Sequence, residues 1–104
     1  MRFLSFVLFV LLSGCFFQVH NLDEGIHDFQ NQDYRQAFIR LKPEAERGQR
    51  DAQYAVGYMY YYGQGVVEDR RKAWFWITRA ATAGQPDAIK AVKVLRRGAG
   101  RPNY

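Results

Sequence analysis

The stretch from Ala52 to Ala88, AQYAVGYMYYYGQGVVEDRRKAWFWITRAATAGQPDA, decides the fold, because its second half repeats an earlier part of the chain. Eight pairs of residues lie 36 positions apart, and seven of the eight pairs are identical. The pairs are Asp33 and Asp69, Ala37 and Ala73, Leu41 and Ile77, Ala45 and Ala81, Gly48 and Gly84, Gln49 and Gln85, Asp51 and Asp87, and Ala52 and Ala88. A period of this size with helical spacing inside it predicts stacked helical hairpins, each too small to bury its own apolar face.

The spacing of apolar residues and of helix caps predicts five helical segments. They run from about Leu22 to the break at Asn31 and Gln32, from the cap at Asp33 to Gly48, from about Arg50 to Tyr62, from the cap at Asp69 to Ala83, and from Pro86 to about Arg97. The expected fold is all-α: a short α-solenoid of two antiparallel helical hairpins plus a closing helix. Since such arrays usually need about three repeats, we expect marginal stability.

Each predicted helix has an apolar face that should meet the core. The core positions are expected to be Ala37, Phe38, Leu41 and Ala45; Ala52, Ala55, Val56, Met59 and Tyr60; Ala73, Trp76, Ile77, Ala80 and Ala81; and Ala88, Ala91, Val92 and Leu95. Gly57 lies outside its helix's apolar face, where a missing side chain would let another helix approach closely. Pro43 predicts a kink or a restart of the second helix.

The same stretch resembles the Sel-one-like repeat, an α-solenoid relative of the tetratricopeptide repeat. The residues that carry the resemblance are Ala52 to Gly57, Met59, Tyr60, Gly63 to Val66, Asp69, Lys72, Ala73, Trp76, Ala80, Ala81, Gly84 and Ala88. One near-complete copy covers about a third of the chain, while Asp33 to Ala52 matches only the second half of a copy and has Arg40 where the repeat has Trp. The resemblance implies protein–protein interaction, often as an adaptor or scaffold, and in bacteria often at the cell envelope.

The N-terminal residues are typical of an export signal. Phe3 to Leu12 is apolar except for Ser5, and this run of residues is too short to span a bilayer. Leu12-Ser13-Gly14-Cys15, which follows it, resembles a bacterial lipobox. We therefore expect a lipoprotein signal peptide at 1–14, lipid attachment at Cys15, a tether at 15–21, the repeat domain at 22–97 and a flexible tail at 98–104. The protein would be lipid-anchored at the bacterial cell envelope. An ordinary signal peptide and an uncleaved anchor remain the alternatives.

Composition and motifs favour binding over catalysis. The chain of 104 residues has a formal charge of +5 and carries eight Phe, seven Tyr and two Trp. We expect no catalytic residues, no cofactor and no metal, and interpret His20 and His27 as solvated polar residues. Cysteine-rich members of the repeat family imply a β-lactam-binding or hydrolysing enzyme as a further alternative, but this chain has no Cys after Cys15. Nucleic acid is not expected as a partner of an exported lipoprotein.

Two surface features are candidate partner sites. The first is aromatic: Tyr54, Tyr58 and Tyr61 fall opposite the main core face of their helix, and Phe75 lies on a polar face. Tyrosine is favoured at interfaces because it buries area at low entropic cost; the competing interpretation is that some of these rings belong to the core. The second is the basic closing helix, with Lys90, Lys93, Arg96 and Arg97, which would bind an anionic envelope polymer or surface or simply be a solvated cap. We expect a protein partner, and a weak homodimer stacked end to end is a further possibility.

Overall fold

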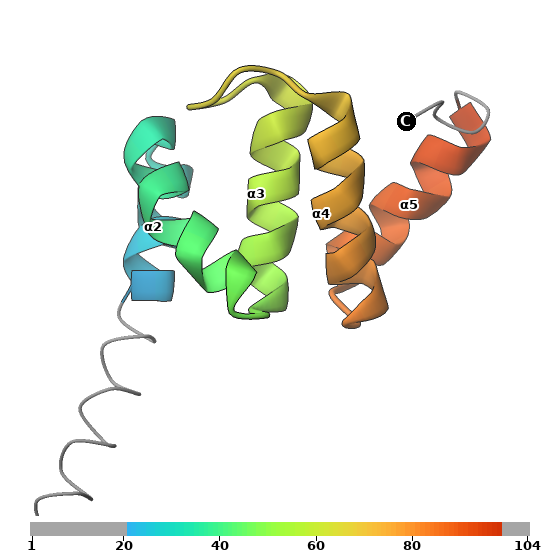
Figure 1. Ribbon diagram of the computed structural model, residues 1–104, viewed down its shortest axis with the longest axis horizontal. Helices are drawn as coiled ribbons and strands as arrows, with labels where there is room; N and C mark the ends of the chain where they lie inside the picture. Colours follow the sequence, from blue (N-terminus) through green and yellow to red (C-terminus); the bar gives the residue numbers. More distant parts are fainter. Residues whose placement is uncertain (1–20, 99–104) are drawn as a thin grey trace, which may run out of the picture.

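The structure, a computed structural model, describes residues 21–98, and every regular element in that range is a helix (Figure 1). Residues 21–30 are helical and are called the N-terminal helix below. The remaining helices are α2 (Tyr34–Glu46), α3 (Arg50–Tyr62), α4 (Arg70–Thr82) and α5 (Pro86–Gly98). The prediction of an all-α, short solenoid is confirmed. The predicted signal peptide at 1–14 and Cys15 lie outside the described residues, as do positions 99–104 of the predicted tail.

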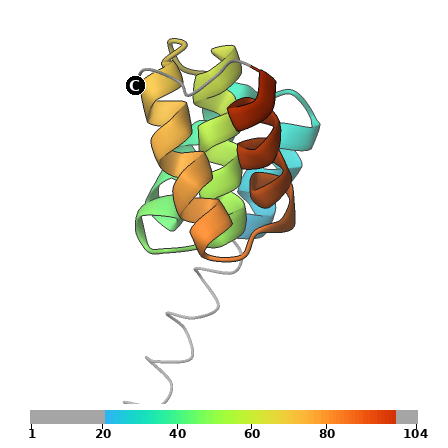
Figure 2. The ribbon, with the colours of Figure 1, turned by 90° about the vertical axis from the view of Figure 1, so that its right-hand side faces the viewer.

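The helices form two hairpins and a closing helix, as the sequence predicted. The N-terminal helix pairs with α2, α3 pairs with α4, and α5 packs on α4 (Figures 1 and 2). The N-terminal helix, α3 and α5 line one face of the solenoid, while α2 and α4 meet on the other. Within residues 21–98, no helix has both the length and the apolar character that crossing a membrane requires.

The ends of α2 and α4 show the 36-residue repeat in three dimensions. Gly48 and Gly84 both have positive φ, at 100° and 88°. Their amides donate to Ala45 and Ala81, three residues back, at 3.1 and 3.0 Å. Gly48, where the second predicted helix ends, is therefore a left-handed closure, and the same closure recurs one period later at Gly84.

The two N-caps differ, so one cap prediction is wrong. The Asp69 carboxylate accepts from the amide of Lys72 at 3.0 Å, as expected for an N-cap. Asp33 holds the equivalent place before α2, but its side chain makes no capping hydrogen bond. The backbone explains the difference: Asp33 has ψ 69° after the left-handed Gln32 (φ 65°), whereas Asp69 is extended with φ −149°.

The core is a row of small and branched side chains between the two layers. Its fully buried members are Ala37, Leu41, Ala45, Ala52, Val56, Met59, Ala73, Ala80 and Ala88, with Tyr60, Trp76 and Ile77 almost as deep. A Cβ on Gly57 would lie 2.6 Å from Cγ1 of Ile77 and 3.1 Å from the carbonyl oxygen of Ala73, so the predicted close approach to α4 is confirmed. α2 continues through Pro43 to Glu46 as a single helix and does not restart there.

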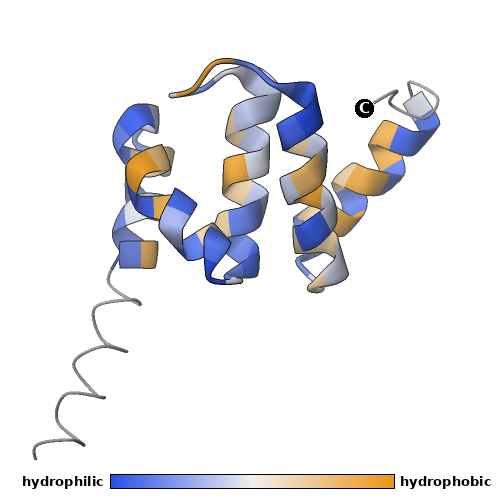
Figure 3. Ribbon diagram, viewed as in Figure 1, coloured by the Kyte–Doolittle hydropathy of each residue, from blue (hydrophilic) through white to orange (hydrophobic). Residues whose placement is uncertain are grey.

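Some core predictions need correction. Ala55 is only partly buried, while Gln53 is 4 % exposed and donates its amide to the carbonyl oxygen of Ala45 at 3.1 Å. Phe38, Ala81, Ala91, Val92 and Leu95 are also only partly buried. Hydrophobic residues occur along α5 as they do along α3 and α4 (Figure 3), but of α5 only Ala88 is buried. The reason is that α5 has neighbours on fewer sides than α3.

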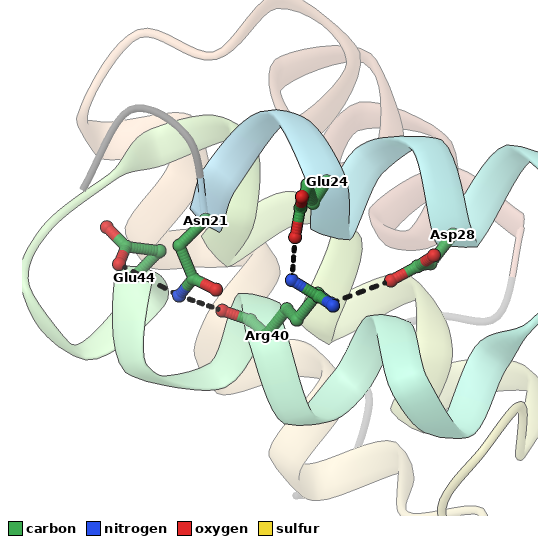
Figure 4. A network of polar contacts seen from close by, with 5 residues as sticks. All are labelled: Asn21, Glu24, Asp28, Arg40 and Glu44. Carbon is green, nitrogen blue, oxygen red and sulfur yellow. Dashed lines mark hydrogen bonds and ion pairs between the residues drawn. The ribbon is translucent and has the colours of Figure 1, made fainter. Parts of the chain in front are cut away.

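A polar network takes the place of one core aromatic residue in the first hairpin. Arg40 occupies the place that Trp76 holds one period later, and its guanidinium lies between Glu24 and Asp28 of the N-terminal helix (Figure 4). Its Nε is 3.0 Å from Oδ2 of Asp28. These ion pairs join the N-terminal helix to α2 at the position where the second hairpin has Trp76.

The same network extends to a buried carboxylate. Glu44 is only 2 % exposed and pairs with Arg47 at 2.6 Å. The side-chain amide of Asn21 donates to Oε1 of Glu44 at 3.3 Å and to the carbonyl oxygen of Arg40 at 3.0 Å (Figure 4). Every charged group in this cluster therefore has an opposite charge or a hydrogen bond, as burial requires.

Candidate functional site

A row of tyrosines along α3 is the most distinctive surface of the molecule. Residues four apart are neighbours on a helix, and Tyr54, Tyr58 and Tyr62 follow this interval, with ring centroids 6.3 and 4.7 Å apart. Tyr61 adds a fourth ring, 4.9 Å from that of Tyr62. Tyr54, Tyr58 and Tyr61 are partly buried, and Tyr62 is 56 % exposed. The rings therefore hold one another in place while part of each remains open.

The helices on either side of α3 turn this row into a groove. On one side, the N-terminal helix contributes Ile26 and Phe29, and the Phe29 ring meets that of Tyr58 at 5.6 Å. On the other side, α5 contributes Lys90, Ala91, Val94 and Leu95. Each side forms a hollow of about 360 Å³, and Tyr54 and Tyr58 line both hollows. We call this continuous surface the tyrosine groove.

The tyrosine groove is mainly apolar and has few charges. Its charged lining residues are Asp51 in the first hollow and Asp87 and Lys90 in the second. Burial raises the pKa of Tyr54, and the nearby carboxylate of Asp87 adds to this effect, so the phenol is neutral at physiological pH. The groove thus offers ring faces and neutral hydroxyls, which suit an apolar or weakly polar segment.

The structure brings together three of the four predicted aromatic residues. Tyr54, Tyr58 and Tyr61 all line the groove. Phe75 does not: it lies on α4, 49 % exposed, with its ring 5.1 Å from Trp76 and the Arg79 guanidinium 5.1 Å from its centroid.

Sequence reasoning missed several groove residues. Tyr62 was detectable, since it continues the interval of four from Tyr54 and Tyr58. Phe29, Val94 and the other wall residues were not, because their part in the groove depends on how the neighbouring helices pack.

The four cations of the closing helix have different surroundings. Lys90 lines the tyrosine groove. Arg96 lies over the Trp74 ring of α4 at 5.8 Å, while Lys93 and Arg97 are exposed. Lys90 alone among the four therefore belongs to the candidate site.

A larger hollow of about 650 Å³ lies between α2, the 65–69 loop and the start of α4. Its lining mixes the charged side chains of Arg35, Glu68, Asp69 and Lys72 with apolar ones. Asp69 is engaged as a helix cap and Glu68 pairs with Arg70 at 3.0 Å. This hollow lacks the continuous aromatic lining of the tyrosine groove and is the weaker candidate.

Metal chemistry finds no support among residues 21–98, where no group of three or more His, Cys, Asp or Glu is placed to hold an ion. The Nε2 atom of His27 is 3.0 Å from the side-chain amide of Asn31, within hydrogen-bond distance. His20 lies outside the described residues.

Comparisons with known proteins agree with this architecture. Residues 50–85 match the Sel1 repeat family, and this range contains all of α3 and α4. The chain is 34 % identical over 65 residues to the ERAD-associated E3 ubiquitin-protein ligase component HRD3A of Arabidopsis thaliana. The match covers 61 % of this chain but only 10 % of the relative, so the chain spans about a tenth of that protein's length. No solved structure matches the chain significantly.

Proposed function

We propose that the tyrosine groove holds a segment of a partner protein, as in an adaptor or scaffold, because residues 50–85 match the Sel1 repeat, which is a protein–protein interaction module. The observation that carries the proposal is the row of four tyrosines along α3, in ring contact with one another and still partly open.

Two physical arguments support binding at this row. Tyrosine combines a large apolar ring with a hydroxyl that can find a hydrogen-bond partner, so it contributes strongly when a partner covers it. The rings are also restrained by their neighbours before any partner arrives, since Tyr58 contacts Phe29, Tyr54 and Tyr62. A preorganised surface loses less side-chain entropy on binding, which improves affinity without added area.

A photo-crosslinking experiment tests the groove directly. A photoreactive amino acid replaces Tyr62 in one version of the full chain and Ile39 in another, and crosslinked products are compared in the cells that express the protein. The two positions are matched, since both are 56 % exposed, but Ile39 lies on the opposite face. We expect a specific protein adduct from position 62 and none from position 39. Equal adducts from both positions, or adducts from position 39 alone, would refute the groove.

Salt dependence separates this proposal from its alternative, in which the basic closing helix binds an anionic envelope polymer. Exposed charges are largely screened beyond about 10 Å at 0.1 M salt, so binding by Lys93 and Arg97 would weaken steeply in 0.5 M salt. Capture through the tyrosine groove, which is mainly apolar, should change little.

We also propose that the module is anchored to the bacterial envelope through lipid on Cys15. The support is the lipobox-like Leu12-Ser13-Gly14-Cys15 after an apolar run. The intact mass and the membrane partition of the full chain, each compared with those of Cys15→Ala, test this proposed location. Removal of residues 1–14 with added lipid mass, and release of the variant into the soluble fraction, are the expected results. An unmodified Cys15 would contradict the anchor and leave the groove proposal standing.

A further inference from the structure

The internal repeat gives each residue of α5 a counterpart in α3, and comparing their burial reveals an uncovered surface. Val56 is fully buried, whereas its counterpart Val92 is only partly buried. Gln53 is 4 % exposed, whereas its counterpart Ile89 is 37 % exposed. The two helices have the same register but not the same neighbours.

α4 is the helix that packs closely on this side of α3. It approaches Gly57 so closely that a Cβ there would overlap Ile77. The pairing of layers is repeated too: the Phe38 ring of α2 meets Tyr60 at 5.5 Å, and one period later Trp74 of α4 meets Arg96 at 5.8 Å. α4 and α5 thus form a surface, called the platform below, that is equivalent to the surface of α2 and α3 on which α4 packs. No described helix packs on this platform.

The exposed side of this platform has a defined chemistry. Ile89, Val92, Lys93 and Arg96 fall at i, i+3, i+4 and i+7, which places them on one stripe of α5. We call this stripe, together with Trp74 of α4, the α4–α5 face. Two of its residues differ in type from their counterparts in α3: Lys93 corresponds to Gly57, and Arg96 corresponds to Tyr60. Arg97 lies beside them, and no Asp or Glu follows Asp87 in the sequence.

We propose that the α4–α5 face binds an amphipathic helix of a partner protein whose apolar stripe is flanked by Asp or Glu, and that this helix completes a third hairpin. The position follows from the way α4 covers α3, and the charge follows from Lys93, Arg96 and Arg97. Complementary charge of this kind selects partners and speeds their association. Lys93 in place of Gly57 keeps the bound helix farther away than α4 is from α3. A second copy of this chain pairing through its own α5 would place like charges against one another, which disfavours it.

Two synthetic peptides test this proposal on the full 104-residue chain. Both are about 20 residues long, because shorter isolated helices are marginal in water. Both have Ala, Trp, Ile and Ala at the spacing of Ala73, Trp76, Ile77 and Ala80. The remaining positions are Glu and Gln in one peptide and Lys and Gln in the other. Fluorescence anisotropy of the labelled peptides measures binding.

We expect the acidic peptide to bind at least about tenfold more tightly than the basic one. The double variant Lys93→Glu with Arg96→Glu should reverse this preference, and its gain of basic-peptide binding shows that it is folded. Arg35→Glu, an exposed charge reversal on α2, should leave the preference unchanged. Ile89→Glu should weaken binding of the acidic peptide about tenfold.

Three results would overturn the inference: no binding of either peptide, equal binding of both, or a preference that survives the double variant. Loss of acidic-peptide binding on Tyr62→Glu would place the peptide in the tyrosine groove and would also overturn it. The outcome is independent of the groove proposal, because Tyr62→Glu and Ile89→Glu alter different faces.

Discussion

The close contact between α3 and α4 depends on the missing side chain of Gly57, and Gly57→Ala tests how rigid that contact is. The new Cβ would lie 2.6 Å from Cγ1 of Ile77, 3.0 Å from the backbone nitrogen of Ile77 and 3.1 Å from the carbonyl oxygen of Ala73. Two of these three atoms belong to the backbone. A change of side-chain rotamer can move only the first, so the two helices must separate.

The expected loss of stability combines two opposing effects. Inserting a methyl group into a well-packed core costs about 1–3 kcal/mol. Alanine favours a helix interior over glycine by about 0.5–1 kcal/mol, which offsets part of that cost. The two ranges leave a net loss between about 0 and 2.5 kcal/mol, and since two of the three close atoms are backbone atoms we expect about 1–2 kcal/mol. For a domain of this size, that lowers the melting temperature by about 5–15 °C.

Urea unfolding followed by circular dichroism at 222 nm measures this change. Gly98→Ala is the matched control, because a Cβ at Gly98 meets nothing within 4 Å and its φ is not positive. The control should unfold at nearly the wild-type urea concentration. If Gly57→Ala is as stable as the wild type, α3 and α4 separate without cost, and the argument from close approach is refuted.

Three further predictions follow from the caps, the core and the groove. Asp69→Ala should lower the free energy of unfolding by about 1 kcal/mol in urea titrations, because the Asp69 side chain caps α4. Asp33→Ala should change it by less than about 0.5 kcal/mol, because the Asp33 side chain makes no capping hydrogen bond. Equal losses would contradict this assignment. Trp76→Ala, which removes a side chain only 6 % exposed, should cost about 3–5 kcal/mol and leave the chain largely unfolded by circular dichroism, so a native spectrum would count against its place in the core. Burial, and then the Asp87 carboxylate, raise the pKa of Tyr54 above 10.0 in the folded chain. The shift stabilises the folded state below about pH 10, and this stabilisation is lost as the pH rises through the raised pKa. Tyr54→Phe should reduce this alkaline loss in urea titrations between about pH 9 and 11, and an unchanged pH profile would contradict the shift.

The 36-residue period was sufficient to predict the features that depend on a few neighbouring residues. The closures at Gly48 and Gly84 and the cap at Asp69 are local, and the structure has all three. Asp33 shows the limit of this reasoning, since capping depends on one backbone angle that the preceding turn sets. Gln53 shows another limit: an apolar pattern does not predict the burial of a glutamine, yet its side-chain amide donates to the carbonyl oxygen of Ala45, which also accepts from the amide of Gly48.

Features that depend on the order of the helices could not be read from one helix alone. The interval of four placed the tyrosines on one side of α3, but their partial burial follows from the positions of the N-terminal helix and α5. The same reason accounts for Val92 and Leu95. Their counterparts in α3 are buried in a helix that packs against both α2 and α4, and the sequence of α5 does not say what packs on α5.

The two hairpins share a backbone plan but are held together by different forces, and this bears on the groove. In the second hairpin Trp76 fills the space between helices, whereas in the first Arg40 joins Glu24 and Asp28. A partly buried network of this kind stabilises only while it is complete, because a charge left without its partner is costly. The N-terminal helix that the network holds also supplies Phe29, which supports the ring of Tyr58. The tyrosine groove therefore has one wall held by charge pairs at Arg40 as well as by apolar packing, and one wall, at α5, that is packed through Ala88 and is otherwise only partly covered.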